Sequence, residues 1–308
     1  MQFRSARIFL ASLSLLAIAC DSGRGGGGGR SNDLALSTVF EDMARPTGDL
    51  GQLGCEGLGS GCYTVYAHGD HTLYRIDLQS KRLETVGPFN APNVLVGSKM
   101  EEDVITDLAV APDDTIWVIS NTAIYTASPT DGHVTRRGNL AACGQAGVAL
   151  TFTPDGKLYT ADFKGAFCRI DTSASPPTVT PVASLGSGMA VSGDLVAVAD
   201  GTMYATAYRL SDASNTGTQL KNLLVKVNPA TAAVTTMGST GYPKLFGVAF
   251  AMGQVFGFTH DGTGEVITIN PTTGVGTLFN SFPDPASTMG DGIRFAGAGV
   301  NSMVSPIN

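Results

Sequence analysis

Five acidic residues stand next to the starts of short apolar runs, and they are the side chains best suited to hold a cation or to polarise a substrate. They are Glu102, Asp103, Asp107, Asp194 and Asp291. Converging carboxylates can bind Ca²⁺, which takes six to eight oxygen ligands. Solvated turn acids in an acidic chain explain the same pattern without a ligand. We therefore treat the five as a candidate ligand face; no cofactor is predicted, and Ca²⁺ is the cation such a set would take.

Two further turns carry histidine beside aspartate. They are His68-Gly69-Asp70-His71 and His260-Asp261-Gly262. Imidazole and carboxylate ligands together suit a transition metal, so His68, His71 and His260 join Asp107 and Asp291 as metal candidates. Such turns also form without any metal, and we expect the two to lie far apart in neighbouring repeats. His133 is interpreted as a turn residue.

A catalytic set is missing from the sequence. No Gly-x-Ser-x-Gly element precedes a helix, and the run Gly25–Gly29 is not followed by one, so neither a hydrolase nucleophile nor a phosphate loop is indicated. Trp117 sits among Ile and Val within an apolar run and is interpreted as a core residue. The residue types therefore favour binding over catalysis.

Cys20 differs from the other cysteines because it ends an apolar N-terminal segment. Residues 1–19 combine Arg4 and Arg7 with an apolar run shorter than the ~20 residues of a membrane-spanning helix, which is typical of a secretory signal peptide. Ala17-Ile18-Ala19-Cys20 resembles the lipobox of bacterial lipoproteins, although that family prefers Leu at the position of Ala17. The resemblance implies cleavage before Cys20 and acylation of its sulfur, which would anchor the chain to a membrane. An ordinary signal peptide with an incidental Cys is the alternative.

The residues after Cys20 form a Gly-rich stretch, 20–33, that we interpret as a flexible tether, followed by an extension of uncertain structure over 34–60. Whether the inner or the outer membrane holds the lipid stays open. The signal peptide contains two of the 19 basic residues and none of the 26 acids, so the mature chain has a net charge of −9. That charge argues against nucleic acid as a partner.

Four more cysteines, an even number, predict two disulfides in an exported chain. They are Cys55, Cys62, Cys143 and Cys168. Three pairings are possible, and we favour the local pairs Cys55–Cys62 and Cys143–Cys168. No Cys/His spacing indicates zinc.

The elements that must position these residues are short strands that repeat about every 45 residues. Apolar runs end in Asp/Gly turns, as at Pro112-Asp113-Asp114 and Pro154-Asp155-Gly156, and a second strand returns. Further pairs flank Asp/Asn(-Pro) turns, as in Val225-Lys226-Val227-Asn228-Pro229. Four antiparallel strands per repeat make one propeller blade. The expected inner strands share an apolar pattern and are 105–111, 147–153, 193–199, 245–251 and 291–297.

The two ends of the repeat region complement each other. The first recognisable strands, after residue 61, lack an inner strand before them, and the last inner strand has few residues behind it. Joining them completes one blade and removes an open sheet edge. We therefore predict an all-β domain over 61–308: a five-bladed β-propeller closed by strands from both termini. A sixth blade requires strands within 33–60 and 299–308; a β-sandwich or β-helix is the other alternative.

These repeats resemble the broad NHL, YVTN and quinoprotein-type propeller superclass over residues 61–298. Ligands of propellers usually meet the face where inner strands begin, which is where the five acids are expected. The leading hypothesis is a non-catalytic binding or scaffold module, lipid-anchored at the cell envelope, for an envelope protein, peptide or glycan. The competing hypothesis is a lyase or lactonase that uses central carboxylates and a divalent cation.

Overall fold

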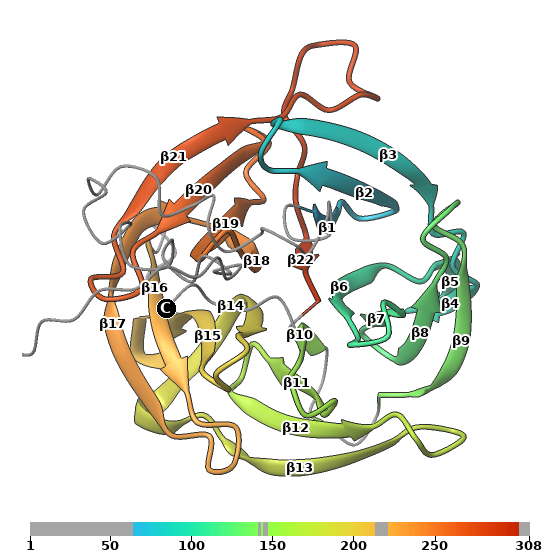
Figure 1. Ribbon diagram of the computed structural model, residues 1–308. Helices are drawn as coiled ribbons and strands as arrows, with labels where there is room; N and C mark the ends of the chain where they lie inside the picture. Colours follow the sequence, from blue (N-terminus) through green and yellow to red (C-terminus); the bar gives the residue numbers. More distant parts are fainter. Residues whose placement is uncertain (1–63, 141–142, 144–146, 213–220, 302–308) are drawn as a thin grey trace, which may run out of the picture. The chain divides into compact units, whose positions relative to one another are not determined.

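The computed structural model describes residues 64–140, 143, 147–212 and 221–301. In this part of the chain five four-stranded antiparallel sheets surround a common axis (Figure 1). The protein is a five-bladed β-propeller, as the repeat predicts. Cys20, Cys55 and Cys62, with the expected signal peptide, tether and 34–60 extension, lie outside the described residues.

Each blade runs from an inner strand at the axis to an outer strand at the rim. Blade 1 consists of β22 (Gly297–Gly299), β1 (Thr64–His68), β2 (Thr72–Asp77) and β3 (Arg82–Pro88). Blade 2 consists of β6 (Ile105–Val110), β7 (Ile116–Ser120), β8 (Ala123–Ala127) and β9 (Val134–Asn139). Blade 3 consists of β10 (Gly147–Phe152), β11 (Leu158–Asp162), β12 (Ala166–Asp171) and β13 (Thr178–Ser184).

Blades 4 and 5 follow the same order. Blade 4 consists of β14 (Met189–Ala197), β15 (Met203–Arg209), β16 (Lys221–Val227) and β17 (Val234–Pro243). Blade 5 consists of β18 (Leu245–Ala251), β19 (Gln254–Thr259), β20 (Glu265–Ile269) and β21 (Gly276–Ser281). A separate hairpin of β4 (Asn93–Val96) and β5 (Lys99–Glu102) connects blades 1 and 2.

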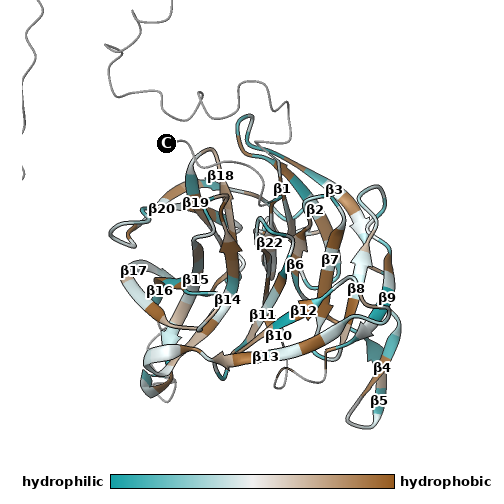
Figure 2. Cartoon of the chain, turned by 60° about the horizontal axis from the view of Figure 1, so that its bottom comes forward, coloured by the Kyte–Doolittle hydropathy of each residue, from teal (hydrophilic) through white to brown (hydrophobic). Residues whose placement is uncertain are grey.

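Burial decreases from the axis to the rim and explains the apolar pattern of the repeats. Five of six residues of β6 are buried, whereas none of β9 is. The cores lie between neighbouring sheets and are built from apolar side chains of the first three strands, with Tyr125 and Phe256 among the largest. Figure 2 shows this apolar character along inner strands such as β18 and β6. Among the described residues no helix is long and apolar enough to cross a membrane.

The ring closes between the two ends of the described chain. Strand β22 pairs antiparallel with β1, with Ala298 opposite Ala67 and Gly297 opposite His68. The predicted closure by both termini is therefore confirmed, but the inner strand begins at Gly297 rather than at residue 291. Residues before it bond elsewhere: the Gly292 amide donates to Gly262 O at 2.8 Å, and the Ile293 amide donates to Phe282 O at 3.2 Å. Their backbone is thus committed to the neighbouring loops of blade 5.

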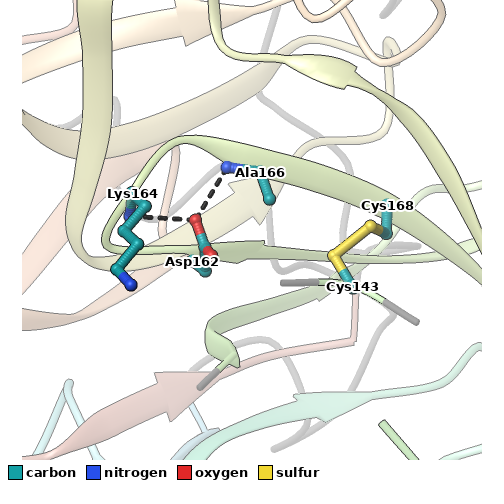
Figure 3. Close-up of a disulfide and its surroundings, with 5 residues drawn as sticks. All are labelled: Cys143, Asp162, Lys164, Ala166 and Cys168. Atoms are coloured by element: carbon teal, nitrogen blue, oxygen red, sulfur yellow. Dashed lines mark hydrogen bonds between the residues drawn. A yellow bond between two sulfur atoms is a disulfide. The ribbon is translucent and has the colours of Figure 1, made fainter. Parts of the chain in front are cut away.

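One predicted disulfide is present in the described region. Cys143, between β9 and β10, is bonded to Cys168 of β12, with the Cα atoms 5.8 Å apart (Figure 3). Beside it the β11–β12 turn is held by Asp162, whose Oδ1 accepts the amides of Lys164 at 2.9 Å and Ala166 at 2.7 Å. The bond therefore fastens the connection entering blade 3 to that blade's third strand.

Candidate functional site

Two of the predicted acids, Asp107 and Asp194, meet at the propeller axis. Asp107 lies on β6 and Asp194 on β14, the inner strands of blades 2 and 4, and both side chains are fully buried. Their carboxyl groups are within hydrogen-bonding reach of each other. Each is followed by a leucine whose amide donates to the preceding carboxyl oxygen, Leu108 at 2.8 Å and Leu195 at 2.5 Å. The two acids therefore occupy equivalent positions in their strands.

All five inner strands contribute to this carboxyl pair. Asp194 Oδ2 accepts the amide of Val248, from β18, at 2.7 Å and that of Ala298, from β22, at 3.4 Å. The amide of Leu150, from β10, acts on Asp107 and lowers its pKa. An inner strand has no neighbouring strand on its axial side, so its amides there need an acceptor. The carboxyl pair supplies acceptors for five strands at once.

The pair retains a proton. Burial, with the neighbouring Asp194 carboxylate, raises the pKa of Asp107 well above its ordinary value. Burial also raises the pKa of Asp194, to about 8, even though the hydrogen bonds from Asp107 and three backbone amides act in the opposite direction. Two buried carboxyls in contact cannot both be charged at low cost, so they titrate as a pair. Burial therefore favours proton-bearing forms of the pair, while the surrounding backbone amides favour the charged form of each carboxyl.

This donor set does not match the expected Ca²⁺ site. The carboxyl oxygens face amide hydrogens and each other, whereas Ca²⁺ needs six to eight oxygens around an open position. Within the described part of the chain, no three His, Cys, Asp or Glu side chains are grouped so as to hold a metal ion. The chemistry available at the axis is proton sharing and backbone capping.

His68 lies beside the pair at the end of β1. Its Nδ1 is 2.7 Å from Gly69 O, which places the ring proton on Nδ1, and its buried Nε2 has no partner in the described structure. Burial lowers the pKa of His68 to about 4. A β-carbon on Gly297 would lie 2.5 Å from this Nε2 and would collide with Asp107 Oδ1. The axis has no room for a third side chain at the Gly297 position.

A second feature is an open pocket of about 390 Å³ between blades 1 and 5. Its walls are the β1–β2 turn, the β19–β20 turn and the loop from β21 to β22, which projects at the rim (Figure 1, red). Its charged and titratable lining residues are Asp70, His71, Tyr74, Asp261, Asp284, Asp291 and Arg294. The two His/Asp turns that were expected to lie far apart thus line one pocket, because both flank the segment that leads into β22.

The pocket is strongly acidic, with four carboxylates and one guanidinium. Asp261 Oδ1 accepts the amide of Thr263 at 3.0 Å, and Asp291 Oδ2 accepts Ser287 Oγ at 3.2 Å. The Arg294 guanidinium packs over Gly262, with Nη2 3.3 Å from where a β-carbon would stand, and makes no ion pair with the described residues. Burial raises the pKa of Tyr74, with a contribution from the Asp284 charge.

The remaining predicted acids lie away from the axis. Glu102, on β5, has Oε2 3.3 Å from His71 Nδ1 and Oε1 3.0 Å from the amide of Ala91. It therefore ties the β4–β5 hairpin to the pocket rim. Asp103 is only 4% exposed and accepts Ser120 Oγ and Tyr125 Oη, both at 2.6 Å. Burial, together with the hydrogen bond to Asp103, raises the pKa of Tyr125. This geometry gives Asp103 a structural role inside blade 2.

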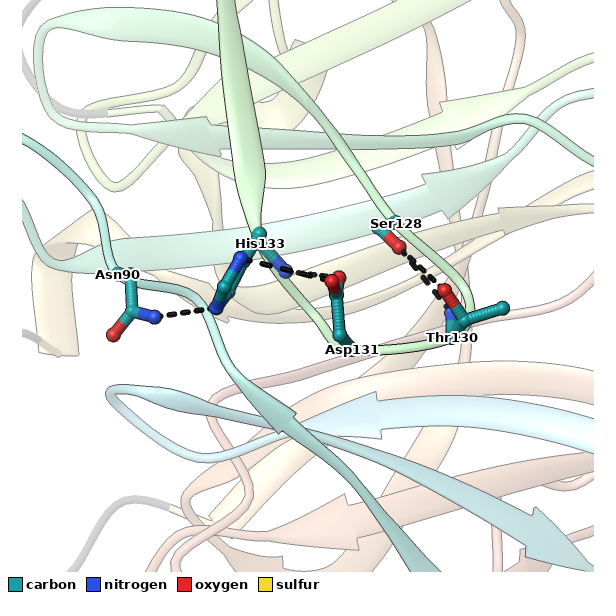
Figure 4. Close-up of polar contacts among 5 residues, drawn as sticks. All are labelled: Asn90, Ser128, Thr130, Asp131 and His133. Carbon is teal, nitrogen blue, oxygen red and sulfur yellow. Dashed lines mark hydrogen bonds and ion pairs between the residues drawn. The ribbon is translucent and has the colours of Figure 1, made fainter.

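The other histidines have packing and turn contacts. His260 stacks on Phe246 with ring centroids 4.7 Å apart, and its Nδ1 is 3.2 Å from Phe295 O. His133 follows the β8–β9 turn: its amide donates to Asp131 Oδ1 at 3.1 Å, and its Nε2 is 2.6 Å from Asn90 Nδ2 (Figure 4). The interpretation of His133 as a turn residue fits these contacts.

Several pocket residues were not selected from the sequence. Asp70 and Asp261 stand inside the quoted turns but have the composition of ordinary turn residues, and Arg294 falls in the segment expected to be a strand. The sequence does contain a pattern that marks the axis. Each inner strand has one backbone amide that bonds to the carboxyl pair, and the residues just before these amides are Asp107, Ala149, Asp194, Gly247 and Gly297. Two acids among three small residues indicate a narrow space that only two side chains fill.

Comparison with solved structures finds matches of low sequence identity, three of which follow. It resembles a chain of a nidogen/laminin complex (TM-score 0.48, 12% identity, covering 78% of this chain and 98% of that one). It also resembles the Dos1 propeller (TM-score 0.42, 13% identity, covering 71% and 61%). A third match is a gluconolactonase from Xanthomonas campestris (TM-score 0.44, 14% identity, covering 72% and 75%). No family model and no curated protein matches the sequence.

Proposed function

We propose that the protein is a non-catalytic binding module, exported and lipid-anchored through Cys20 at the cell envelope. Its ligand face is the acidic pocket between blades 1 and 5, and its ligand is an envelope protein or peptide that presents basic side chains. The observation that carries the proposal is the pocket lining, where four carboxylates face solvent against a single guanidinium. Charge complementarity of this kind speeds association and selects partners.

Binding fits the geometry better than the lyase or lactonase hypothesis. That chemistry requires central carboxylates that reach a substrate and a cation, whereas Asp107 and Asp194 are fully buried and bonded to backbone amides. The accessible carboxylates are those of the pocket. Asp261 and Asp284 cap the backbone of their own loops, which holds them as fixed charges at the surface.

The test uses the mature chain in detergent and three variants. We expect a lysine-rich peptide to bind the wild type, to be displaced by salt, and to bind Asp70→Asn/Asp291→Asn at least tenfold more weakly, as measured by calorimetry. Asp200→Asn removes an exposed charge in blade 4 and is the matched control. Arg294→Ala should bind as well or better. Equal affinity of the double variant and the control, or tighter binding of neutral oligosaccharides than of the peptide, would refute the proposed ligand.

The anchor has its own test. We expect the wild-type chain, expressed in a bacterium that processes lipoproteins, to enter the detergent phase of a temperature-induced partition, because two acyl chains bury enough methylenes for stable anchoring. Cys20→Ser should remain in the aqueous phase and keep its full signal peptide or lose it by ordinary cleavage. Recovery of Cys20→Ser in the detergent phase would contradict lipid attachment at this residue.

A further inference from the structure

We propose that Arg294 makes the acidic pocket between blades 1 and 5 a receptor for a chain end. Its guanidinium binds the free carboxylate of a C-terminal lysine or arginine, and the surrounding aspartates bind the basic side chain of that same residue. This ligand rests on the proposed function and specifies which part of the peptide enters the pocket. Three features carry it: the place of Arg294, the packing of its guanidinium and the charges around it.

Arg294 lies on the segment that leads into β22, and both His/Asp turns contact this segment. In the β19–β20 turn, Gly262 O accepts the amide of Gly292 at 2.8 Å. In the β1–β2 turn, a β-carbon on Gly69 would stand 3.5 Å from Arg294 O. The segment is thus held between the two acidic turns, and it brings one cation between the carboxylates of blade 1 and those of blade 5.

The guanidinium of Arg294 is held by packing and not by an ion pair. Its Nη2, Cζ and Nε lie 3.3, 3.5 and 3.6 Å from the place that a β-carbon of Gly262 would take. Because these three distances are nearly equal, the plane of the guanidinium lies flat across the glycine. Guanidinium N–H groups point outward within that plane, so this packing does not use them. Among the described residues they have no hydrogen-bond or ion-pair partner, and they are available to a ligand.

The carboxylates around Arg294 are held by their own loops. Asp261 Oδ1 accepts the amide of Thr263 at 3.0 Å and its hydroxyl at 2.6 Å. Asp284 Oδ1 accepts the amide of Ala286 at 2.9 Å. The pocket therefore keeps fixed charges of both signs apart. A ligand that carries both signs satisfies all of them, whereas a purely basic ligand meets the guanidinium as a like charge.

A C-terminal basic residue carries both signs within one residue. Its carboxylate suits a guanidinium, with which it forms two parallel charge-assisted hydrogen bonds, and its side chain suits the aspartates. The pocket volume of about 390 Å³ is near the lower end of the range for small-ligand sites, about 300–1,000 Å³. This size fits a chain end better than a folded surface, and capture of a terminal carboxylate is a recurring mode of peptide recognition.

Amidation of the peptide C-terminus distinguishes this ligand from a lysine run within a chain. Amidation removes a negative charge, so a pocket that attracts only basic groups would bind the amide as tightly as the free acid or more tightly. With Arg294 as partner of the carboxylate the order is reversed, because the amide loses two charge-assisted hydrogen bonds and leaves the guanidinium without an anion. The sign of the difference is therefore diagnostic.

The experiment measures by calorimetry how an N-acetylated peptide ending in two lysines, and its C-amidated twin, bind the mature chain in detergent. We expect the wild type to bind the free acid at least about tenfold more tightly than the amide. In Arg294→Ala this ratio should fall below about twofold, while the amide binds as well or better because a like charge is gone. Arg169→Ala, which removes an exposed guanidinium from β12 in blade 3, is the matched control and should keep the wild-type ratio.

The outcomes separate this ligand from the proposed function. If the wild type binds both peptides equally, or the amide more tightly, the pocket still binds basic segments but the chain end is refuted; this comparison needs no variant. If neither peptide binds, the proposed function fails as well. A preference for the free acid that persists in Arg294→Ala would overturn the role of Arg294. Free lysine that binds as tightly as the acetylated peptide would overturn a peptide end as the ligand.

Discussion

Asp103 offers a quantitative test of its role in the fold. A residue of the ligand face should affect binding when it is replaced, whereas a buried hydrogen-bond acceptor should affect the free energy of unfolding. In the structure its carboxylate accepts the hydroxyls of Ser120 and Tyr125, each at 2.6 Å. A hydrogen bond to a charged acceptor contributes about 1.5–3 kcal/mol. The lower figure applies because removal of the carboxylate also relieves its own desolvation. Asp103→Ala should therefore destabilise the fold by about 3 kcal/mol.

A double-mutant cycle separates this network from general damage. Tyr125→Phe removes one of the two bonds and should cost about 1.5 kcal/mol. Asp103→Ala/Tyr125→Phe should cost about 3 kcal/mol, little more than Asp103→Ala alone, because the shared bond is lost only once. Urea unfolding followed by the fluorescence of Trp117, on the neighbouring strand β7, measures all three. A cost below about 0.5 kcal/mol for Asp103→Ala, together with loss of ligand binding, would refute the structural role.

Two further predictions concern the same fold. Replacing both Cys143 and Cys168 by Ser opens a loop with a separation of 25 residues and should lower the free energy of unfolding by roughly 3.5 kcal/mol; a reduced wild type that unfolds at the same urea concentration as the oxidised one would contradict this. Gly297→Ala places a methyl group against Asp107 and His68 and should cost about 3 kcal/mol, the upper range for overpacking. Gly69→Ala, whose methyl would meet only ordinary contacts, is the control and should leave the melting temperature nearly unchanged; equal effects of the two changes would show that the axis tolerates the methyl.

Sequence reasoning succeeded where a local pattern repeats. Apolar alternation and Asp/Asn turns located most strands, and the complementary ends predicted the closure that β22 and β1 make. It failed at 291–297 because the choice between strand and loop there is made by distant partners: Gly292 bonds to Gly262. The short hairpin β4–β5 had no counterpart in the repeat and was not anticipated.

The candidate site was less predictable for a similar reason. Asp107 and Asp194 are 87 positions apart in the chain, and only the closed ring shows that they meet. Asp103, four residues before Asp107, also precedes an apolar residue but hydrogen-bonds inside blade 2. The sequence shows which residue stands at each position. The direction of its side chain depends on strand register and on bulges such as the one between Ile105 and Asp107.

Blade 1 begins with the first described strand and is completed by the last. During synthesis, β1 to β3 emerge early and wait with an uncovered inner edge until Gly297–Gly299 has been made. A product that stops before Gly297 lacks β22, so it exposes the edge of β1 and leaves Asp194 without the Ala298 amide. Completion of the ring is thus coupled to synthesis of residues 297–299, more than 200 positions after the strand that they pair with.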